Sequence, residues 1–262
     1  MSDKKALLHY KQHINPTYDR QALTESYACL TSYYKPLLSL IGELCSECQK
    51  ILEISHSYSP LAENVSAAEK TFLTDDSFTA MLEYHCYPNV DVWHLPFNSV
   101  GFETFGHKEQ YQLIVSDFGL NYSDLFDNIK YFMSLLQCGG YFIPIVPAWW
   151  FLRDNLNEGE NEILQYAKKT DKQWIFQENL DFAAEDNGGK VERIVRLDNT
   201  REFHRGEAAK LAGLTKLYQA ECTGDISILE TVTIPQTLEL TPAALVIQKQ
   251  KKTLDKNNLF NI

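Results

Sequence analysis

The sequence lacks the long hydrophobic segments of a membrane or secreted protein. It contains no run of about 18 or more apolar residues, the length that a membrane-spanning helix requires. Its first residues, MSDKKALLHYKQHINP, are polar and have no apolar signal core. We therefore predict a cytoplasmic protein with no membrane partner.

Basic residues are also scarce. The chain has 24 Lys and Arg against 35 Asp and Glu, a formal net charge of -11. Because nucleic-acid binding needs a basic face, we predict no nucleic-acid partner. The basic residues that are present gather between Lys168 and Arg205, where a carboxylate partner could be attracted. A solvated face of mixed charge is the alternative.

The six cysteines offer little metal chemistry. Cys45 and Cys48 form a C-x-x-C pair, but a four-thiolate zinc site needs a second such pair, which the sequence lacks. A thioredoxin-like motif follows a strand, whereas a helical pattern precedes this pair. We predict reduced thiols and no bound metal.

What the sequence does contain is an alternation of strand and helix patterns over residues 50–147, typical of a mostly parallel α/β sheet. The predicted strands cover 50–54, 71–73, 90–93, 111–115, 141–146, 191–197, 215–220 and 243–248. The predicted helices cover 18–48 with a kink or break at Pro36, a short segment from Pro60 capped by Ser59, 77–82, 125–136 with Gly139 and Gly140 as its terminating turn, 158–169 and 207–211.

Seven short segments follow one another in a characteristic order. They read Y-D-R-Q-A (18–22), I-L-E-I-S-H-S-Y-S (51–59), T-D-D-S-F-T-A-M-L (74–82), D-V-W-H-L-P-F (91–97), S-D-F-G-L-N-Y (116–122), Q-C-G-G-Y-F (137–142) and E-A-A-K-L-A-G-L (207–214). Together they resemble the motifs of the class I S-adenosylmethionine-dependent methyltransferases. The resemblance is greatest to members that methylate small molecules or carrier proteins, including the malonyl-acyl-carrier-protein O-methyltransferase of biotin synthesis.

The resemblance implies a Rossmann-like class I methyltransferase fold. This fold has a mostly parallel seven-stranded sheet, helices on both faces and a substrate-cover insertion. The implied division is an N-terminal helical cap (1–48), a cofactor-binding α/β core (49–147), the insertion (148–205), the C-terminal part of the core (206–250) and a flexible tail (251–262).

The resemblance also implies S-adenosylmethionine as the cofactor, bound where the strand order reverses at the carboxyl ends of the strands. Asp75, or its neighbour Asp76, would accept hydrogen bonds from the ribose hydroxyls; alternatively one of them caps the following helix. Asp91 would accept from the adenine amino group, or serve as a turn residue. The expected cofactor-binding residues are Tyr18, Glu53, Ser55, Ser57, Ser59, Asp75, Asp76, Asp91, Val92, Ser116 and Phe118.

The first motif departs from the family pattern because Ser55, Ser57 and Ser59 replace its three glycines. Glycine permits positive φ and close approach of the backbone to a ligand, whereas serine adopts such φ values at a cost of about 1 kcal/mol. The serine hydroxyls could instead bind the ligand. We therefore expect a methyltransferase for a small molecule or a carrier-protein-bound acyl or carboxylate acceptor. The alternative is a non-catalytic binding or regulatory protein of the same fold.

Methyl transfer needs mainly proximity and orientation, so the sequence identifies no catalytic base with certainty. Arg153 and Arg205 could clamp a carboxylate or phosphate, since arginine matches such groups bidentately. The further candidates are the four histidines His56, His94, His107 and His204 as bases, and Trp149, Trp150, Phe151 and Trp174 as packing residues or walls of an acceptor pocket.

Overall fold

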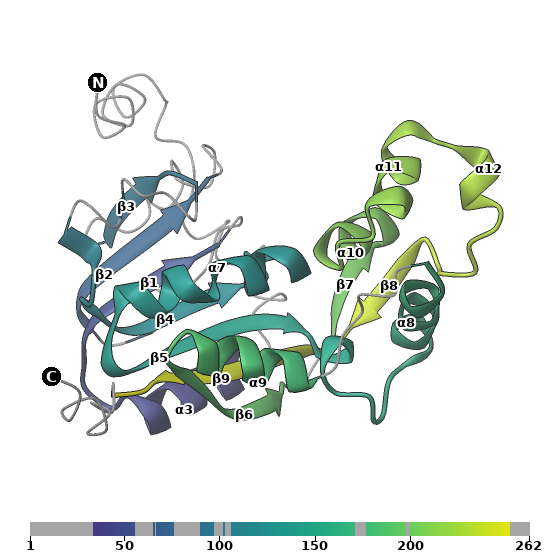
Figure 1. Cartoon of the computed structure of the whole chain (residues 1–262). Helices are drawn as coiled ribbons and strands as arrows, with labels where there is room; N and C mark the ends of the chain where they lie inside the picture. Colours follow the sequence, from purple (N-terminus) through teal and green to yellow (C-terminus); the bar gives the residue numbers. More distant parts are fainter. Residues whose placement is uncertain are drawn as a thin grey trace, which may run out of the picture.

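A seven-stranded sheet forms the centre of the molecule (Figure 1). The computed structural model describes residues 34–55, 65, 67–75, 90–96, 102, 106–170, 177–197 and 200–251. The strands are β1 (Cys48–Ile54), β2 (Ala67–Thr74), β3 (Val90–His94), β4 (Tyr111–Asp117), β5 (Leu136–Pro147), β6 (Gly189–Arg196) and β9 (Pro242–Lys249). Their order is β3-β2-β1-β4-β5-β9-β6. Strands β1 to β5 are parallel and β9 is antiparallel to both neighbours, so the predicted mostly parallel sheet is confirmed.

Helices cover the sheet and explain why its strands are apolar runs. Helices α7 (Tyr122–Leu135) and α9 (Gln177–Asp186) pack against each other in front of β4, β5 and β9 in Figure 1. Helix α3 (Tyr34–Leu44) lies behind β9 in the same view, and its Glu43 forms an ion pair with Arg193 of β6 at 2.9 Å. Strands buried on both faces need apolar residues at every position, as β9 shows. Among the described residues, no helix is both long and apolar enough to cross a membrane.

Of the helical segment predicted over 18–48, the structure describes residues 34–48. Tyr34–Leu44 is helix α3, whereas residues 45–47 form a turn and Cys48 begins β1, so the prediction is wrong at its end. The helix is continuous from Pro36 to Leu44. Leu37 and Ile41, four residues apart, are both buried. Residues 18–33 lie outside the described part of the chain.

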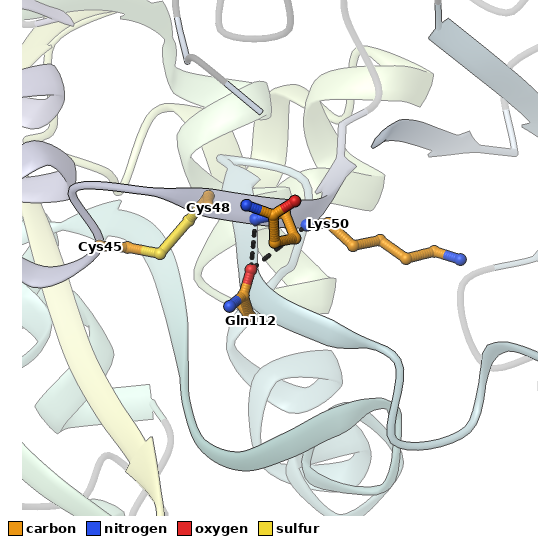
Figure 2. Close-up of a disulfide and its surroundings, with 5 residues drawn as sticks. Cys45, Cys48, Lys50 and Gln112 are labelled. Carbon is orange, nitrogen blue, oxygen red and sulfur yellow. Dashed lines mark hydrogen bonds between the residues drawn. A yellow bond between two sulfur atoms is a disulfide. The ribbon is translucent and has the colours of Figure 1, made fainter. Parts of the chain in front are cut away.

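The prediction of reduced thiols is wrong for Cys45 and Cys48, which form a disulfide (Figure 2). Helix α3 ends at Leu44 and β1 begins at Cys48, so the bond closes the turn between these elements. The closed loop has four residues, and chain entropy gives such a short loop roughly 2 kcal/mol of stabilisation. Beside it, the side-chain oxygen of Gln112 accepts a hydrogen bond from the backbone N–H of Gln49. This turn therefore fixes the start of β1 against β4.

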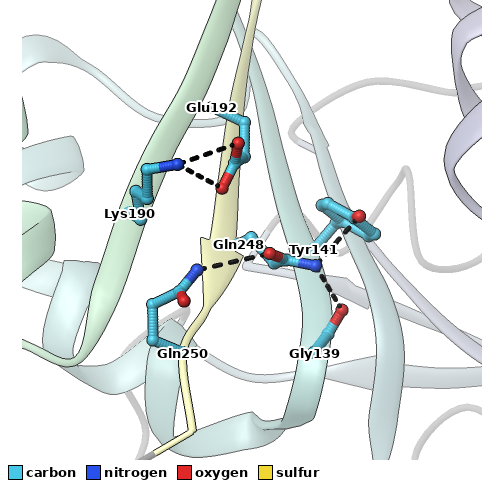
Figure 3. A network of polar contacts seen from close by, with 6 residues as sticks. All are labelled: Gly139, Tyr141, Lys190, Glu192, Gln248 and Gln250. Carbon is cyan, nitrogen blue, oxygen red and sulfur yellow. Dashed lines mark hydrogen bonds and ion pairs between the residues drawn. The ribbon is translucent and has the colours of Figure 1, made fainter.

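Polar side chains join the strands β5 and β9, and Lys190 and Glu192 form an ion pair within the neighbouring strand β6 (Figure 3). Gln248 of β9 donates to the hydroxyl of Tyr141 at 2.9 Å and to the carbonyl oxygen of Gly139 at 3.3 Å. Gly139 has φ of 83° and lies within the irregular start of β5, four residues past the end of α7. The glycine pair thus belongs to the strand and is not the predicted helix-terminating turn, because α7 already ends at Leu135 and β5 begins at Leu136. The network is at the amino end of β5, away from the edge that we describe below.

A second group of elements projects from one end of the sheet, and we call it the arm (Figure 1). It consists of α8 (Glu158–Thr170), β7 (Arg201–His204), α10 (Arg205–Leu211), α11 (Thr215–Thr223), α12 (Ile226–Leu229) and β8 (Thr237–Leu240). Strands β7 and β8 pair antiparallel. The buried carboxylate of Glu160 fixes the arm to the core, because it accepts from the N–H of Asn157 at 3.1 Å and of Thr241 at 2.7 Å.

The structure divides the chain differently from the sequence-based scheme. Strand β6 lies within the range 148–205 expected for the insertion, yet it pairs with β9 in the main sheet. Residues 205–240, expected mostly in the core, build most of the arm. The strand predicted over 215–220 is wrong: this segment is helix α11, with Leu217 and Ala220 buried three residues apart.

Candidate functional site

Three neighbouring strands end side by side and bring three of the predicted residues together. The N–H of Ser55, directly after β1, donates to the carbonyl oxygen of Leu73 in β2 at 3.3 Å, and Asp75 follows two residues later. On the other side of β1, Ile54 pairs with Ser116 of β4. The strand order reverses between β1 and β4, which is where α/β sheets bind ligands. Ser55, Asp75 and Ser116 therefore lie along one carboxyl edge.

The side chains at this edge are polar although they are buried. Glu53, Ser55, Thr74 and Ser116 are each at most 2% exposed. Burying polar groups is unfavourable unless they are hydrogen-bonded. Within the part of the chain that the structure describes, the Ser116 hydroxyl has no hydrogen-bond partner. Buried polar side chains contribute little to an apolar core, so their presence at the carboxyl edge of the sheet favours a ligand site.

The loop after β4 packs tightly on the end of β1. Phe118 has a positive φ of 48°, which is unusual for a residue other than glycine, and its N–H donates to Ile145 of β5. At Gly119, a Cβ atom would lie 2.8 Å from the carbonyl oxygen of Ile54 and 3.1 Å from the Cα of Ser55. Gly119 was missed by the sequence reasoning, although a glycine directly after a strand is a sign of close backbone approach.

Asp91 and Val92 do not lie at the edge, contrary to the prediction. Asp91 pairs with Thr71, and β3 continues for three more residues, about 10 Å at the rise of a strand. Its carboxylate accepts a hydrogen bond from the indole of Trp93 at 2.7 Å, and Val92 is buried. The residue that reaches the edge is His94, whose Nε2 is 3.0 Å from the carbonyl oxygen of Asp75.

Four of the predicted cofactor residues, Tyr18, Ser57, Ser59 and Asp76, lie outside the described part of the chain, as do the base candidate His56 and the aromatic Trp174. Two further base candidates have structural contacts. His107 is buried, stacks on Phe102 with ring centroids 3.9 Å apart, and its Nδ1 is 2.5 Å from the Tyr111 hydroxyl. His204 is the N-cap residue of α10.

Aromatic residues fill the space beyond the ends of β4 and β5. Trp149 and Trp150, in a 3-10 turn (Ala148–Trp150), are fully buried, which agrees with the packing interpretation. The ring of Tyr122, the first residue of α7, meets Trp150 edge-on at 5.2 Å. From the arm, Phe203 approaches Phe118 to 5.2 Å. The arm is thus in direct contact with the candidate site.

The two arginines proposed as clamps differ in their contacts. Arg205 forms an ion pair with Glu221 and donates to the carbonyl oxygen of Ile234 at 2.8 Å, so its role is structural. Arg153 donates to the carbonyl oxygen of Trp149 at 2.7 Å. Burial lowers the pKa of Arg153 from its ordinary value, and the nearby Tyr122 opposes this shift.

Comparisons with known proteins find no matching family model and no matching curated protein. Solved structures do match. The YcgJ protein from Bacillus subtilis is 12% identical with a TM-score of 0.50, over 82% of this chain and 98% of that one. An S-adenosylmethionine-dependent methyltransferase from Methanosarcina mazei is 12% identical with a TM-score of 0.50, over 80% and 97%.

A geranyl diphosphate methyltransferase in complex with S-adenosylmethionine is 13% identical with a TM-score of 0.50, over 90% of this chain and 91% of that one. At such low identity the likeness concerns the fold. With the strand order of the sheet, it shows that this chain has the class I methyltransferase fold.

Proposed function

We propose that this protein is an S-adenosylmethionine-dependent methyltransferase that acts on a small molecule or a carrier-bound acyl group. The observation that carries the proposal is the alignment of Ser55, Asp75 and Ser116 along the carboxyl edge at the reversal of strand order. The geranyl diphosphate methyltransferase of the same fold was solved with S-adenosylmethionine bound, which supports this choice of ligand.

The residues at the edge fit such a ligand in three respects. Asp75 is exposed and placed to accept hydrogen bonds from a ribose diol. The buried Ser116 hydroxyl supplies a polar group without a partner in the described chain, and Gly119 keeps the adjoining loop free of a side chain. Ser55 is the exception, because its Cβ and hydroxyl stand where the family pattern has glycine.

When bound, S-adenosylmethionine would supply a methyl group activated by its sulfonium; transfer of that methyl group to the acceptor nucleophile breaks the carbon–sulfur bond, and the bonding electrons leave with S-adenosylhomocysteine. The protein then has to hold the reactants in line, which can account for most of the acceleration. In our proposal Asp75 and Glu53 position the two ends of the cofactor, and Ser116 and Phe118 border the methyl group. Tyr18, Ser57, Ser59 and Asp76 remain predicted contributors.

Calorimetric titration with S-adenosylhomocysteine tests the proposal. Wild-type protein should bind it. Asp75→Ala should weaken binding roughly ten- to a hundred-fold, because hydrogen bonds to a charged group contribute about 1.5–3 kcal/mol. Asp91→Ala is the matched control, because it removes a carboxylate that lies away from the edge. Absence of binding to wild-type protein at millimolar ligand would exclude the methyltransferase function.

A non-catalytic binding or regulatory protein of this fold is the second candidate. The complete burial of Ser55, in place of a motif glycine, favours it, because an added Cβ and hydroxyl leave less room for a ligand. Ser55→Gly separates the two functions. If the serine only obstructs the site, the variant should bind S-adenosylhomocysteine more tightly; if neither form binds it, the non-catalytic function is favoured.

A further inference from the structure

Arg153 is a half-buried cation that has no acidic partner among the described residues. It follows the turn at the end of β5, and within the described part of the chain it makes one hydrogen bond, from Nη1 to the carbonyl oxygen of Trp149 at 2.7 Å. A guanidinium has five N–H donors, so most of its donor capacity is unused by this contact. No carboxylate of the described residues lies within ion-pair distance of it. Burial lowers the pKa of Arg153 because the charged form loses hydration.

Three other arginines of the chain form ion pairs or hydrogen bonds within the protein. Arg205 is paired with Glu221, and Arg193 with Glu43. Arg196 donates to the carbonyl oxygen of Asp154 at 2.6 Å. The chain carries 35 acidic residues, so a half-buried arginine that contacts none of those described is not explained by a shortage of acids. Its surroundings are suited to an anion from outside the chain.

A chain of aromatic ring contacts begins near Arg153. Tyr122 is close enough to act electrostatically on the guanidinium. The ring of Tyr122 is 4.9 Å from that of Phe126, which in turn is 6.5 Å from Phe151. Tyr122 also begins α7, four residues after Phe118 at the end of β4. The cation and its aromatic neighbours thus adjoin the position that we propose for the methyl group.

We propose that Arg153 determines acceptor specificity by binding an oxyanion, a carboxylate or a phosphate, on a small acceptor whose apolar part lies against Tyr122 and Phe126. That the bound molecule is a methyl acceptor rests on the proposed methyltransferase function. The anion-binding site itself does not require that function. Arginine suits this role because its planar donors match both oxyanions bidentately. The residue holds the acceptor and takes no part in bond making.

The test uses phenylacetate, phenyl phosphate and the neutral phenylacetamide as probes, titrated into the full chain with and without S-adenosylhomocysteine. Wild-type protein should bind at least one anion about ten-fold or more tightly than the amide. Arg153→Gln should abolish this preference. Arg196→Gln, which removes a charge close by in the same region, should retain it. The stronger of the two anions identifies the oxyanion as carboxylate or phosphate.

Arg153→Lys covers the case in which the glutamine variant does not fold, because it keeps the charge but loses the bidentate geometry and should reduce the preference several-fold. The proposal is overturned if wild-type protein shows no preference or no binding, or if the preference survives in Arg153→Gln. The S-adenosylhomocysteine titration tests the methyltransferase function and is interpreted independently of the anion titrations. Its failure, together with an anion preference that depends on Arg153, would reject the methyltransferase and leave the anion site standing.

Discussion

Substitution of Gly119 by alanine tests the packing at the candidate site most directly. The new Cβ would lie 2.8 Å from the carbonyl oxygen of Ile54, 2.9 Å from the Oγ of Ser116 and 3.1 Å from the Cα of Ser55. Real Cβ atoms almost never approach closer than 3.0 Å, and two of these three neighbours are backbone atoms that cannot rotate away. The ends of β1 and β4 must therefore move apart.

The size of the effect follows from the cost of overpacking. Adding a methylene to a closely packed site destabilises a protein by about 1–3 kcal/mol. We expect Gly119→Ala to fall within this range, because the clash is with the backbone of a central strand. The same displacement shifts Ser55 and Ser116, so affinity for S-adenosylhomocysteine should fall as well.

Urea unfolding and calorimetric titration measure the two effects. The matched control is Gly42→Ala in α3, where a Cβ meets nothing within 4 Å. It makes the same chemical change and should stabilise the helix by up to about 1 kcal/mol. The packing argument is refuted if Gly119→Ala is as stable as wild-type protein. If Gly119→Ala is destabilised but binds the ligand with unchanged affinity, the close packing at Gly119 supports the fold and not the ligand site.

Two further predictions concern the buried groups Glu160 and Tyr111. Glu160→Gln places an amide beside the backbone N–H of Thr241 and should lower the free energy of unfolding by about 1–3 kcal/mol, whereas the exposed Glu158→Gln should change it by less than about 0.5 kcal/mol. Burial raises the pKa of Tyr111 above 10.0, so the contribution of this residue to stability should be constant below pH 10.0 and fall as the pH rises further, where the tyrosine ionises in the unfolded chain and not in the folded one. In urea unfolding curves measured above pH 10.0, the free energy of unfolding should fall less with pH for Tyr111→Phe than for wild-type protein. An equal fall in both proteins would contradict the role given to Tyr111.

The central sheet was predictable because its strands differ from their surroundings in the local sequence. The segment 111–115 is a short apolar run between polar turns, and 141–146 has the same form, as expected for strands covered on both sides. Strands β7 and β8 were missed, because each has four residues and, among the described strands, pairs only with the other. Helix α11 was mistaken for a strand since its few apolar residues fit both periods.

The candidate site was predictable where it depends on the ends of strands and not where it depends on register. Ser55 and Asp75 each follow an apolar run directly, so their place at the edge could be inferred from the sequence. Asp91 could not be placed in this way, because its distance from the edge is set by pairing with Thr71, a contact between distant parts of the chain. The motif D-V-W-H-L-P-F shows that a strand is present but not where in that strand Asp91 falls.

Arg153 and Arg205 show why charge chemistry at a site cannot be derived from sequence alone. As residue types they are equivalent, and both lie in the part of the chain expected to cover the substrate. The fold brings Glu221 to Arg205, whereas it brings the carbonyl oxygen of Trp149 and the side chain of Tyr122 to Arg153. A charge paired within the protein has little left to offer a ligand, and a half-buried charge without an acidic neighbour is stabilised by binding an anion. It is therefore the tertiary environment that makes Arg153 the recognition residue and Arg205 a structural one.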